Sequence, residues 1–505
     1  MHSHSAIMTH DVPEVTEAPL ASDKRASFAQ AFNALALVSA LIGIIMSDRS
    51  YEDQFTLLAL ITIFALIVGG GQFLLRHNNA ASLMFAVLSL YVWIAYPLKV
   101  VLMIHDPMAS WVSHQLFDVN SVRREIVGAF YTVIPGIIAL FLGFLAGGKN
   151  VSRDREVPMR LRHGWFIAIV IGLMLLKIFV QLVLDIGLPG VRPRMTSVPF
   201  LVGLLDMLTR PVLFATVNLY FYCVLRLNER RGLLIGLSLM LLNLLLAVRV
   251  GWKGELVIQG LLIVFYLVDG YGHMEPGRRR VVGIVAVGVM VATVNLYTLV
   301  SEYRNYILSG RTMSEAIDKA EDREKKSTSS VSLYPIYNRI NGIDAYYAAV
   351  RLGRGKEFSL ESLLNDNVMD LILVKLYGYD KDKAVTAFGT TQFSVLYLVG
   401  GIPLLIAGCF VLGWVFRWIT GYLKNRLFTS HMTFYAYLPL LCILWIKMLS
   451  AGGMLSLYIK ELMLIIGCLY CIERVCYRTQ TLGADEDCES EQAGLSHPEG
   501  RLIVG

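Results

Sequence analysis

The stretch QFSVLYLVGGIPLLIAGCFVLGWVF, residues 392–416, carries no charged side chain over 25 residues. An α-helix needs about 20 apolar residues to cross about 30 Å of hydrocarbon, so this stretch is long enough to span a bilayer. Similar stretches recur along almost the whole chain, in which 55% of the 505 residues are hydrophobic and only 17% are charged. A water-soluble domain of ordinary composition is much less apolar. The sequence therefore predicts an all-α protein that crosses a membrane many times.

We expect about twelve membrane-spanning helices. The seventh and eighth are the least regular, because Arg249, Lys253 and Glu255 crowd their junction and the eighth is short. The first follows a polar tail with no cleavage pattern of a signal peptide, so it is expected to direct insertion itself. The expected spans are residues 28–46, 54–75, 81–104, 126–147, 164–186, 197–225, 232–248, 254–269, 281–300, 392–416, 432–449 and 454–473.

The basic residues of the short loops set the orientation, because positive charge collects on the cytoplasmic side. They gather after the fourth, sixth, eighth and tenth expected spans, which places the tails 1–27 and 474–505 in the cytoplasm. This pattern also accounts for the formal net charge of +6, so no nucleic-acid partner is expected. The segments assigned to the outside are 105–124, 187–196, 249–253, 301–391 and 450–453.

Residues 301–391 form the one long loop of this topology, between the block of nine spans at 28–300 and the block of three at 392–473. The loop carries 13 Lys and Arg against 13 Asp and Glu, so it is neither a basic arm nor an acidic tail. We expect a folded cap on the outer side; the family resemblance given below implies that this side is the periplasm. Its part LYPIYNRINGIDAYYAAVRLG, residues 333–353, interleaves tyrosines with polar side chains, which suits contact with a sugar or a lipid headgroup. Tyrosines that anchor the chain at the membrane interface are the alternative.

Basic residues at the outer rim are candidates for binding an anion such as a lipid-linked pyrophosphate. Charge-assisted donors, and the planar fork of arginine above all, suit phosphate oxygens. Contact with lipid headgroups is the alternative for each of them. The candidates are Arg123, Arg124, Arg192, Arg194, Arg249, Lys253, Arg304 and Arg339.

Charged residues within the expected spans are a second group of candidates, because burying a charge in a membrane is costly. Asp206 and Arg210 are four residues apart, so they share a helix face and can pair, and Lys177 could join them. A substrate site and a structural ion pair both explain this pattern. Lys99 and Lys447 lie near outer ends of spans and are expected to extend toward the membrane surface.

Three carboxylates near the outer rim are candidates for a general base toward a sugar hydroxyl: Glu255, Glu302 and Asp344. Ion pairing at a helix end is the alternative for each. The D-x-D spacing of Asp380 and Asp382 is better explained as a solvated turn, because lysines alternate with it. No phosphate-binding loop, H-E-x-x-H metal helix or G-x-S-x-G nucleophile motif is present. The absence of a metal or other cofactor is an expectation that comes with the family resemblance described next.

Four stretches carry a resemblance to a known family: RVGWKGE at 249–255, SEYRNY at 301–306, YNRINGIDAYY at 337–347 and the glycine-punctuated segment 388–417. Together they resemble the Wzy-type oligosaccharide repeat-unit polymerases, which make bacterial O-antigens and exopolysaccharides. The resemblance implies a GT-C-like helical bundle of the inner membrane. It also implies transfer of a growing glycan from undecaprenyl pyrophosphate onto a lipid-linked repeat unit, with a polysaccharide chain-length regulator as a partner.

On this resemblance Arg249, Arg304 and Arg339 bind the pyrophosphate and stabilise its developing charge, and Glu255 or Asp344 accepts the proton of the attacking hydroxyl. Other functions remain open. The related O-antigen ligases have a histidine in their large loop, whereas residues 301–391 contain none. A flippase for the same lipid-linked oligosaccharide would need the same basic residues without a large cap. A noncatalytic assembly partner would not need clustered basic residues.

Overall fold

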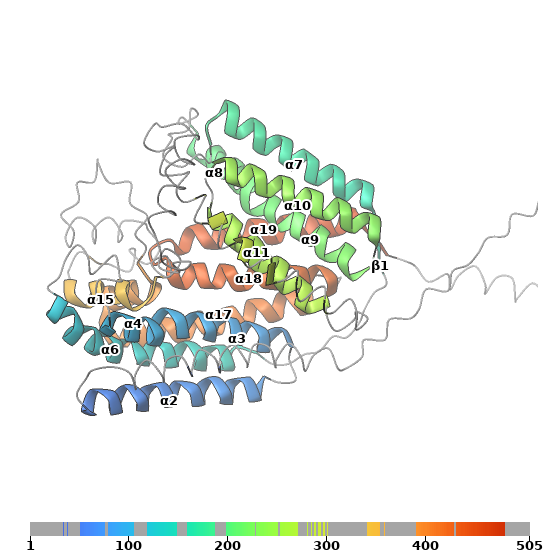
Figure 1. The fold of residues 1–505 in the computed structure, drawn as a ribbon. Helices are drawn as coiled ribbons and strands as arrows, with labels where there is room; N and C mark the ends of the chain where they lie inside the picture. Colours follow the sequence, from blue (N-terminus) through green and yellow to red (C-terminus); the bar gives the residue numbers. More distant parts are fainter. Residues whose placement is uncertain are drawn as a thin grey trace, which may run out of the picture. The chain divides into compact units, whose positions relative to one another are not determined.

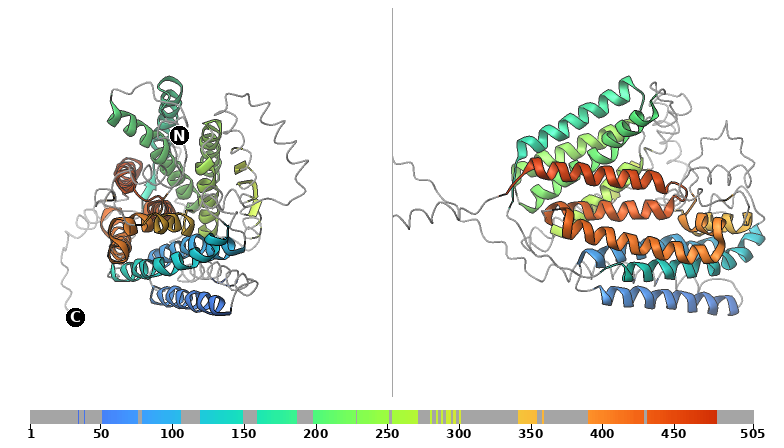
Figure 2. Two further views of the ribbon diagram at one scale, coloured as in Figure 1. Left: turned by 90° about the vertical axis from the view of Figure 1, so that its left-hand side faces the viewer. Right: turned by 180° about the vertical axis from the view of Figure 1, so that it is seen from behind.

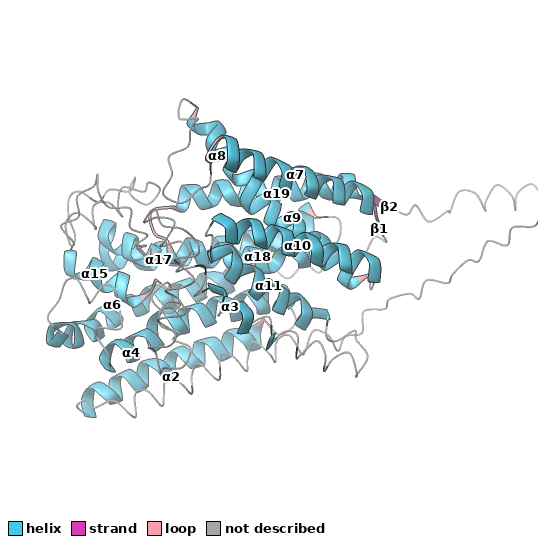
Figure 3. Ribbon diagram, turned by 45° about the horizontal axis from the view of Figure 1, so that its top comes forward, coloured by secondary structure: helices cyan, strands magenta, loops and turns pink. Residues whose placement is uncertain are grey.

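The structure is a computed structural model in which nearly all of the described residues are helical (Figures 1 and 3). The structure describes the ranges 51–75, 79–105, 119–148, 159–186, 198–227, 229–250, 253–270, 341–353, 390–428 and 431–479. It also describes residues 34, 38 and 358 and some of the residues between 280 and 300.

The elements follow the apolar stretches of the sequence. The helices are α2 (Tyr51–Leu74), α3 (Asn79–Trp93), α4 (Lys99–His105), α6 (Val119–Ala146), α7 (His163–Val183), α8 (Pro199–Met207), α9 (Leu213–Arg226), α10 (Arg230–Val250), α11 (Lys253–Gly270), α15 (Ile343–Leu352), α17 (Gln392–Tyr422), α18 (His431–Ser450) and α19 (Leu455–Cys476). Three π-helical turns, η1 (Ile94–Leu98), η3 (Leu208–Val212) and η6 (Leu423–Leu427), and two short strands, β1 (Met159–Leu161) and β2 (Tyr477–Thr479), complete them.

Among the described residues, eight helical segments are long and apolar enough to cross a membrane, which agrees with the prediction of a helical membrane protein. Two shorter apolar helices, Ile61–Leu74 and Gly254–Leu267, coincide with the second and eighth expected spans. The first expected span and most of the ninth lie outside the described residues, so the number twelve stays a prediction. The eight long segments are Ala80–Met103, Glu125–Ala146, His163–Val183, Pro199–Arg226, Arg231–Arg249, Gln392–Leu427, Met432–Ser450 and Leu455–Cys476.

Two of the three π turns contain a proline. Pro97 lies in η1, which joins α3 to α4, and Pro211 lies in η3, which joins α8 to α9. Proline lacks an N–H and its ring clashes with the carbonyl four residues earlier, and a π turn relieves that clash without ending the helix. In α17, Gly401 has φ of 65°, a left-handed value that favours glycine, two residues before Pro403.

The chain divides into two compact units. Unit 1 comprises Met1–Asn150, Leu244–Gly421 and Leu438–Lys460, and unit 2 comprises Val151–Asn243, Tyr422–Tyr437 and Glu461–Gly505.

Within unit 1, glycines let α6 and α17 approach until their backbones touch. A Cβ atom at Gly143 would lie 2.0 Å from the carbonyl oxygen of Phe410, and one at Gly413 would lie 2.0 Å from that of Leu140. Small residues are common where membrane helices meet, because close packing must replace the hydrophobic effect there. Helix α2 lies outermost, beside α3 and α6 (Figures 1 and 2).

Within unit 2, three segments far apart in sequence meet at one end of the helices. Strand β1, before α7, pairs antiparallel with β2, after α19, so that Leu161 is opposite Tyr477 (Figure 3). The Nε2 atom of His163 lies 2.8 Å from a carboxylate oxygen of Glu229, between α9 and α10. All three segments are among those that the basic loops assign to the cytoplasm.

Candidate functional site

Helix α15 comes from the long segment that the sequence analysis treats as a cap. It begins after Gly342 and ends at Gly353, whose φ of 75° suits glycine at a helix end. Almost the whole helix is buried, including Ile343, Tyr346 and Tyr347. These two tyrosines are therefore not the open contact surface or the interface anchors expected from the sequence. They pack into unit 1, where α15 lies against α4 and α6.

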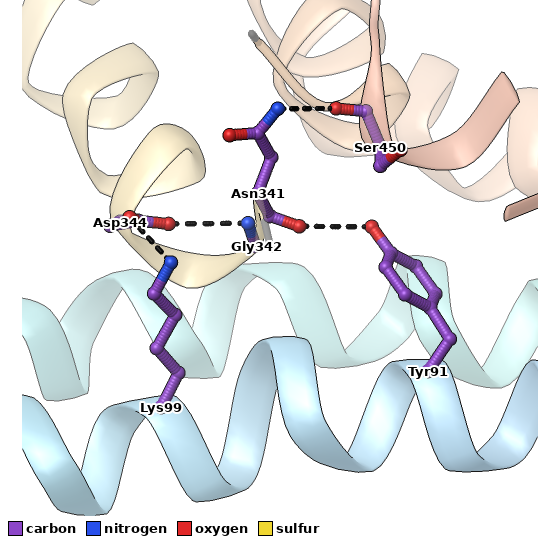
Figure 4. Close-up of polar contacts among 6 residues, drawn as sticks. All are labelled: Tyr91, Lys99, Asn341, Gly342, Asp344 and Ser450. Carbon is purple, nitrogen blue, oxygen red and sulfur yellow. Dashed lines mark hydrogen bonds and ion pairs between the residues drawn. The ribbon is translucent and has the colours of Figure 1, made fainter. Parts of the chain in front are cut away.

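A buried ion pair fastens α15 to the third expected span. The Nζ atom of Lys99 lies 2.6 Å from Oδ2 of Asp344, and the Lys99 side chain is completely buried (Figure 4). The other carboxylate oxygen, Oδ1, accepts a hydrogen bond of 3.2 Å from the N–H of Gly342. The sequence predicted that Lys99 extends toward the membrane surface, and this prediction is wrong. A carboxylate 245 residues away supplies the counter-charge of Lys99 inside the fold.

Two further hydrogen bonds hold the start of α15. The hydroxyl of Tyr91 donates to the carbonyl oxygen of Asn341 at 3.0 Å, and the Asn341 side chain donates to the carbonyl oxygen of Ser450 at 2.9 Å (Figure 4). Gly342 packs directly on the span, since a Cβ atom there would lie 1.9 Å from the carbonyl oxygen of Ala95. Helix α15 is thus attached to both the α3–α4 span and the end of α18.

The end of the long segment is fastened at the same place. The N–H of Gly452, just after α18, donates to the carbonyl oxygen of Thr390 at 2.6 Å, and the Thr390 hydroxyl donates back to Gly452 at 2.9 Å. The Thr391 hydroxyl accepts a hydrogen bond from the N–H of Ser394 at 3.1 Å, which caps α17. Positions 390 and 450 were both assigned to the outside.

A third polar group joins α15 to the beginning of α6. The Tyr347 hydroxyl donates to Oε2 of Glu125 at 2.8 Å, and Arg351 donates to the Tyr347 hydroxyl at 3.2 Å. The Arg351 guanidinium also lies 3.5 Å from Oε2 of Glu125. Unlike Lys99 and Asp344, Glu125 and Arg351 keep a large part of their side chains exposed.

The structure shows where several of the other candidate residues lie, and it confirms the predicted ion pair. Arg210 forms an ion pair with Asp206, as their spacing predicts. Lys177, which could have joined them, donates a hydrogen bond to Asn243 at 3.2 Å. Arg249 is exposed at the end of α10, and Glu255 is half-buried in the first turn of α11.

Several candidates lie outside the described residues or have side chains that do. Lys253 begins α11, and Arg123 and Arg124 lie in α6, but only their backbones are described. The candidates outside the described residues are Arg192, Arg194, Glu302, Arg304, Arg339, Asp380 and Asp382.

Sequence reasoning missed most of the cluster around α15: Lys99 as a partner of Asp344, and the roles of Tyr91, Glu125, Tyr347 and Arg351. One signal was available. A lysine inside an apolar span needs a counter-charge, and Asp344 stands beside an apolar stretch of the long loop, residues 345–350.

The site offers no ligand set for a metal. Within the parts of the chain that the structure describes, no three His, Cys, Asp or Glu side chains gather closely enough to hold an ion. No protein-family model, curated protein or solved structure matches the chain.

Proposed function

We propose that this protein is a membrane glycosyltransferase that polymerises oligosaccharide repeat units carried on undecaprenyl pyrophosphate, at the outer face of the bacterial inner membrane. The observation that carries the proposal is the docking of α15. A helix from the segment between the ninth and tenth expected spans is buried against α4 and α6 and is fixed there by the Lys99–Asp344 ion pair.

A fixed cap at the end of a helical bundle suits an enzyme whose substrates are lipid-linked. The pyrophosphate and the first sugars of such a substrate lie at the membrane surface, where reacting groups must be held in a fixed geometry. The buried ion pair and the hydrogen bonds from Tyr91 and to Ser450 would hold the cap in place while a glycan passes over it.

The same fastening disfavours a flippase, the second candidate. A carrier alternates between two open states by moving helices or half-bundles against each other. Such motion on this side would have to break or carry along a buried ion pair that joins Asp344 to the α3–α4 span, and breaking it is costly. A ligase shares the chemistry of the polymerase and differs in its acceptor.

We assign the residues as follows. Arg249, exposed at the α10–α11 junction, would bind the pyrophosphate together with Lys253, Arg304 and Arg339, and stabilise its charge as it leaves. Glu255, half-buried in the first turn of α11, would accept the proton of the attacking hydroxyl. Asp344 has both oxygens engaged and would act as a positioning residue.

The test is the length of the glycan in cells that lack this protein. Surface polysaccharide would be resolved on gels, and undecaprenyl-linked intermediates would be extracted and analysed by mass spectrometry. Single repeat units with no long chains support a polymerase. Repeat units that accumulate on the cytoplasmic face indicate a flippase, and an unchanged profile contradicts both.

A further inference from the structure

The group formed by Glu125, Tyr347 and Arg351 has a different character from the buried fastening of α15. The Tyr347 ring is buried, with 1% of the residue exposed, so its hydroxyl is held in one place. The side chains of Arg351 and Glu125 are 38% and 48% exposed. One edge of helix α15 is therefore buried and fixed inside the fold, and the other edge has partly exposed polar side chains beside it.

The charges on this edge cancel. Arg351 lies 3.5 Å from the carboxylate of Glu125, so an approaching anion would meet a negative charge directly beside the positive one. This disfavours a phosphate or pyrophosphate, for which unopposed basic residues are needed. The half-exposed carboxylate of Glu125 can accept and the guanidinium of Arg351 can donate hydrogen bonds, which instead match the vicinal hydroxyls of a sugar. The buried Tyr347 hydroxyl bonds to both side chains and positions them.

The phenol keeps its proton at all physiological pH values. Burial, together with the hydrogen bond to Glu125, raises the pKa of Tyr347 to about 12. The hydroxyl therefore stays a neutral hydrogen-bonding group beside the Glu125 side chain.

We propose that Glu125 and Arg351, positioned by the buried Tyr347 hydroxyl, form a binding site for an uncharged, hydroxyl-rich sugar, the acceptor end of the glycan. This inference rests on the proposed polymerase function and specifies where that enzyme holds one of its two substrates. The pyrophosphate of the donor would bind elsewhere, at the basic residues of the α10–α11 junction.

A purely structural role is the competing explanation, and kinetics separate the two. The enzyme would be reconstituted in proteoliposomes with undecaprenyl-linked repeat units extracted from cells that lack it. We expect Glu125→Gln and Arg351→Gln to raise KM for the acceptor about tenfold or more, with kcat changed less than threefold and Tm unchanged. Gly128→Ala is the matched control, because Gly128 is exposed one turn further along α6 and a Cβ atom there meets nothing within 4 Å. Variants that lower Tm and kcat together at an unchanged KM would overturn the proposal.

A second experiment does not depend on polymerase activity. The photoreactive amino acid p-benzoylphenylalanine would be placed at position 128 in living cells, and adducts would be treated with periodate and labelled with a hydrazide to detect sugar. We expect a sugar-bearing adduct that Glu125→Gln abolishes. Adducts with phospholipid alone would overturn the sugar site. A sugar adduct on a protein whose deletion leaves the glycan length unchanged would retain the site and reject the polymerase.

Discussion

Lys99 and Asp344 show how one pair of residues connects α15, from the long segment between two expected spans, to the α3–α4 span. Each charge alone would be costly at a buried position, and together they form an ion pair of 2.6 Å. A buried pair of this kind adds little to stability compared with apolar residues of the same size, but breaking it leaves an uncompensated charge. The pair therefore favours the docked position of α15 over any other.

Replacing one partner of this pair should weaken the fold. We expect Lys99→Met to lower the free energy of unfolding by about 3–5 kcal/mol, because Asp344 would stay buried without its counter-charge. The double variant Lys99→Met with Asp344→Leu should recover most of that loss. Thermal unfolding of the detergent-solubilised protein measures both.

Lys460→Met is the control, since Lys460 is an exposed lysine of α19. A single variant as stable as this control, or a double variant no better than the single one, would contradict the structural role of the pair.

At the scale of whole elements, the membrane-spanning helices were predictable and α15 was only partly so. Residues 392–416 predict a span by themselves, because length and lack of charge are local properties, and α17 covers them. The sequence also marked residues 333–353 as distinctive. It did not predict that Tyr346 and Tyr347 are buried, because their burial depends on packing against α4 and α6, which come much earlier in the chain.

The fit of α15 depends on Gly342. In Gly342→Ala the new Cβ atom would lie 1.9 Å from the carbonyl oxygen of Ala95, so the start of α15 would have to move away from the span. Overpacking of this kind costs about 1–3 kcal/mol. We expect a lower Tm and faster cleavage by an added protease near residue 342.

Gly172→Ala is the matched control for this change, because Gly172 lies in α7 with no atom within 4 Å of an added Cβ. It should leave stability unchanged or raise it slightly, since alanine favours helices. Equal effects of the two substitutions would show that α15 does not pack on the α3–α4 span through Gly342.

At the scale of the whole molecule, the segments that meet within each unit are ones that the pattern of basic residues assigns to the same side of the membrane. In unit 1, Glu125, Asn341, Thr390 and Ser450 surround α15, and all four lie in or at the edge of segments assigned to the outside. In unit 2, the segments that meet at β1 and β2 are all assigned to the cytoplasm. The pattern of basic residues predicts this grouping, and the location of each group relative to the membrane is still a prediction.

Reporter fusions test that orientation. A fusion at residue 155 should be active as a cytoplasmic reporter, because the loop after the fourth span is rich in arginine. A fusion at residue 320 should be active only as a periplasmic reporter. An external signal at residue 155 would reverse the topology and place α15 on the cytoplasmic face. That result would contradict a role for α15 in polymerisation at the periplasmic face.

The most direct test of the central claim is glycan elongation by the purified protein alone. Proteoliposomes that contain it would be supplied with undecaprenyl-linked repeat units, and the lipid-linked products would be resolved by mass. The account predicts a ladder spaced by one repeat unit, formed without added metal or nucleotide and lost in Arg249→Gln. Movement of repeat units between leaflets without any elongation would contradict it.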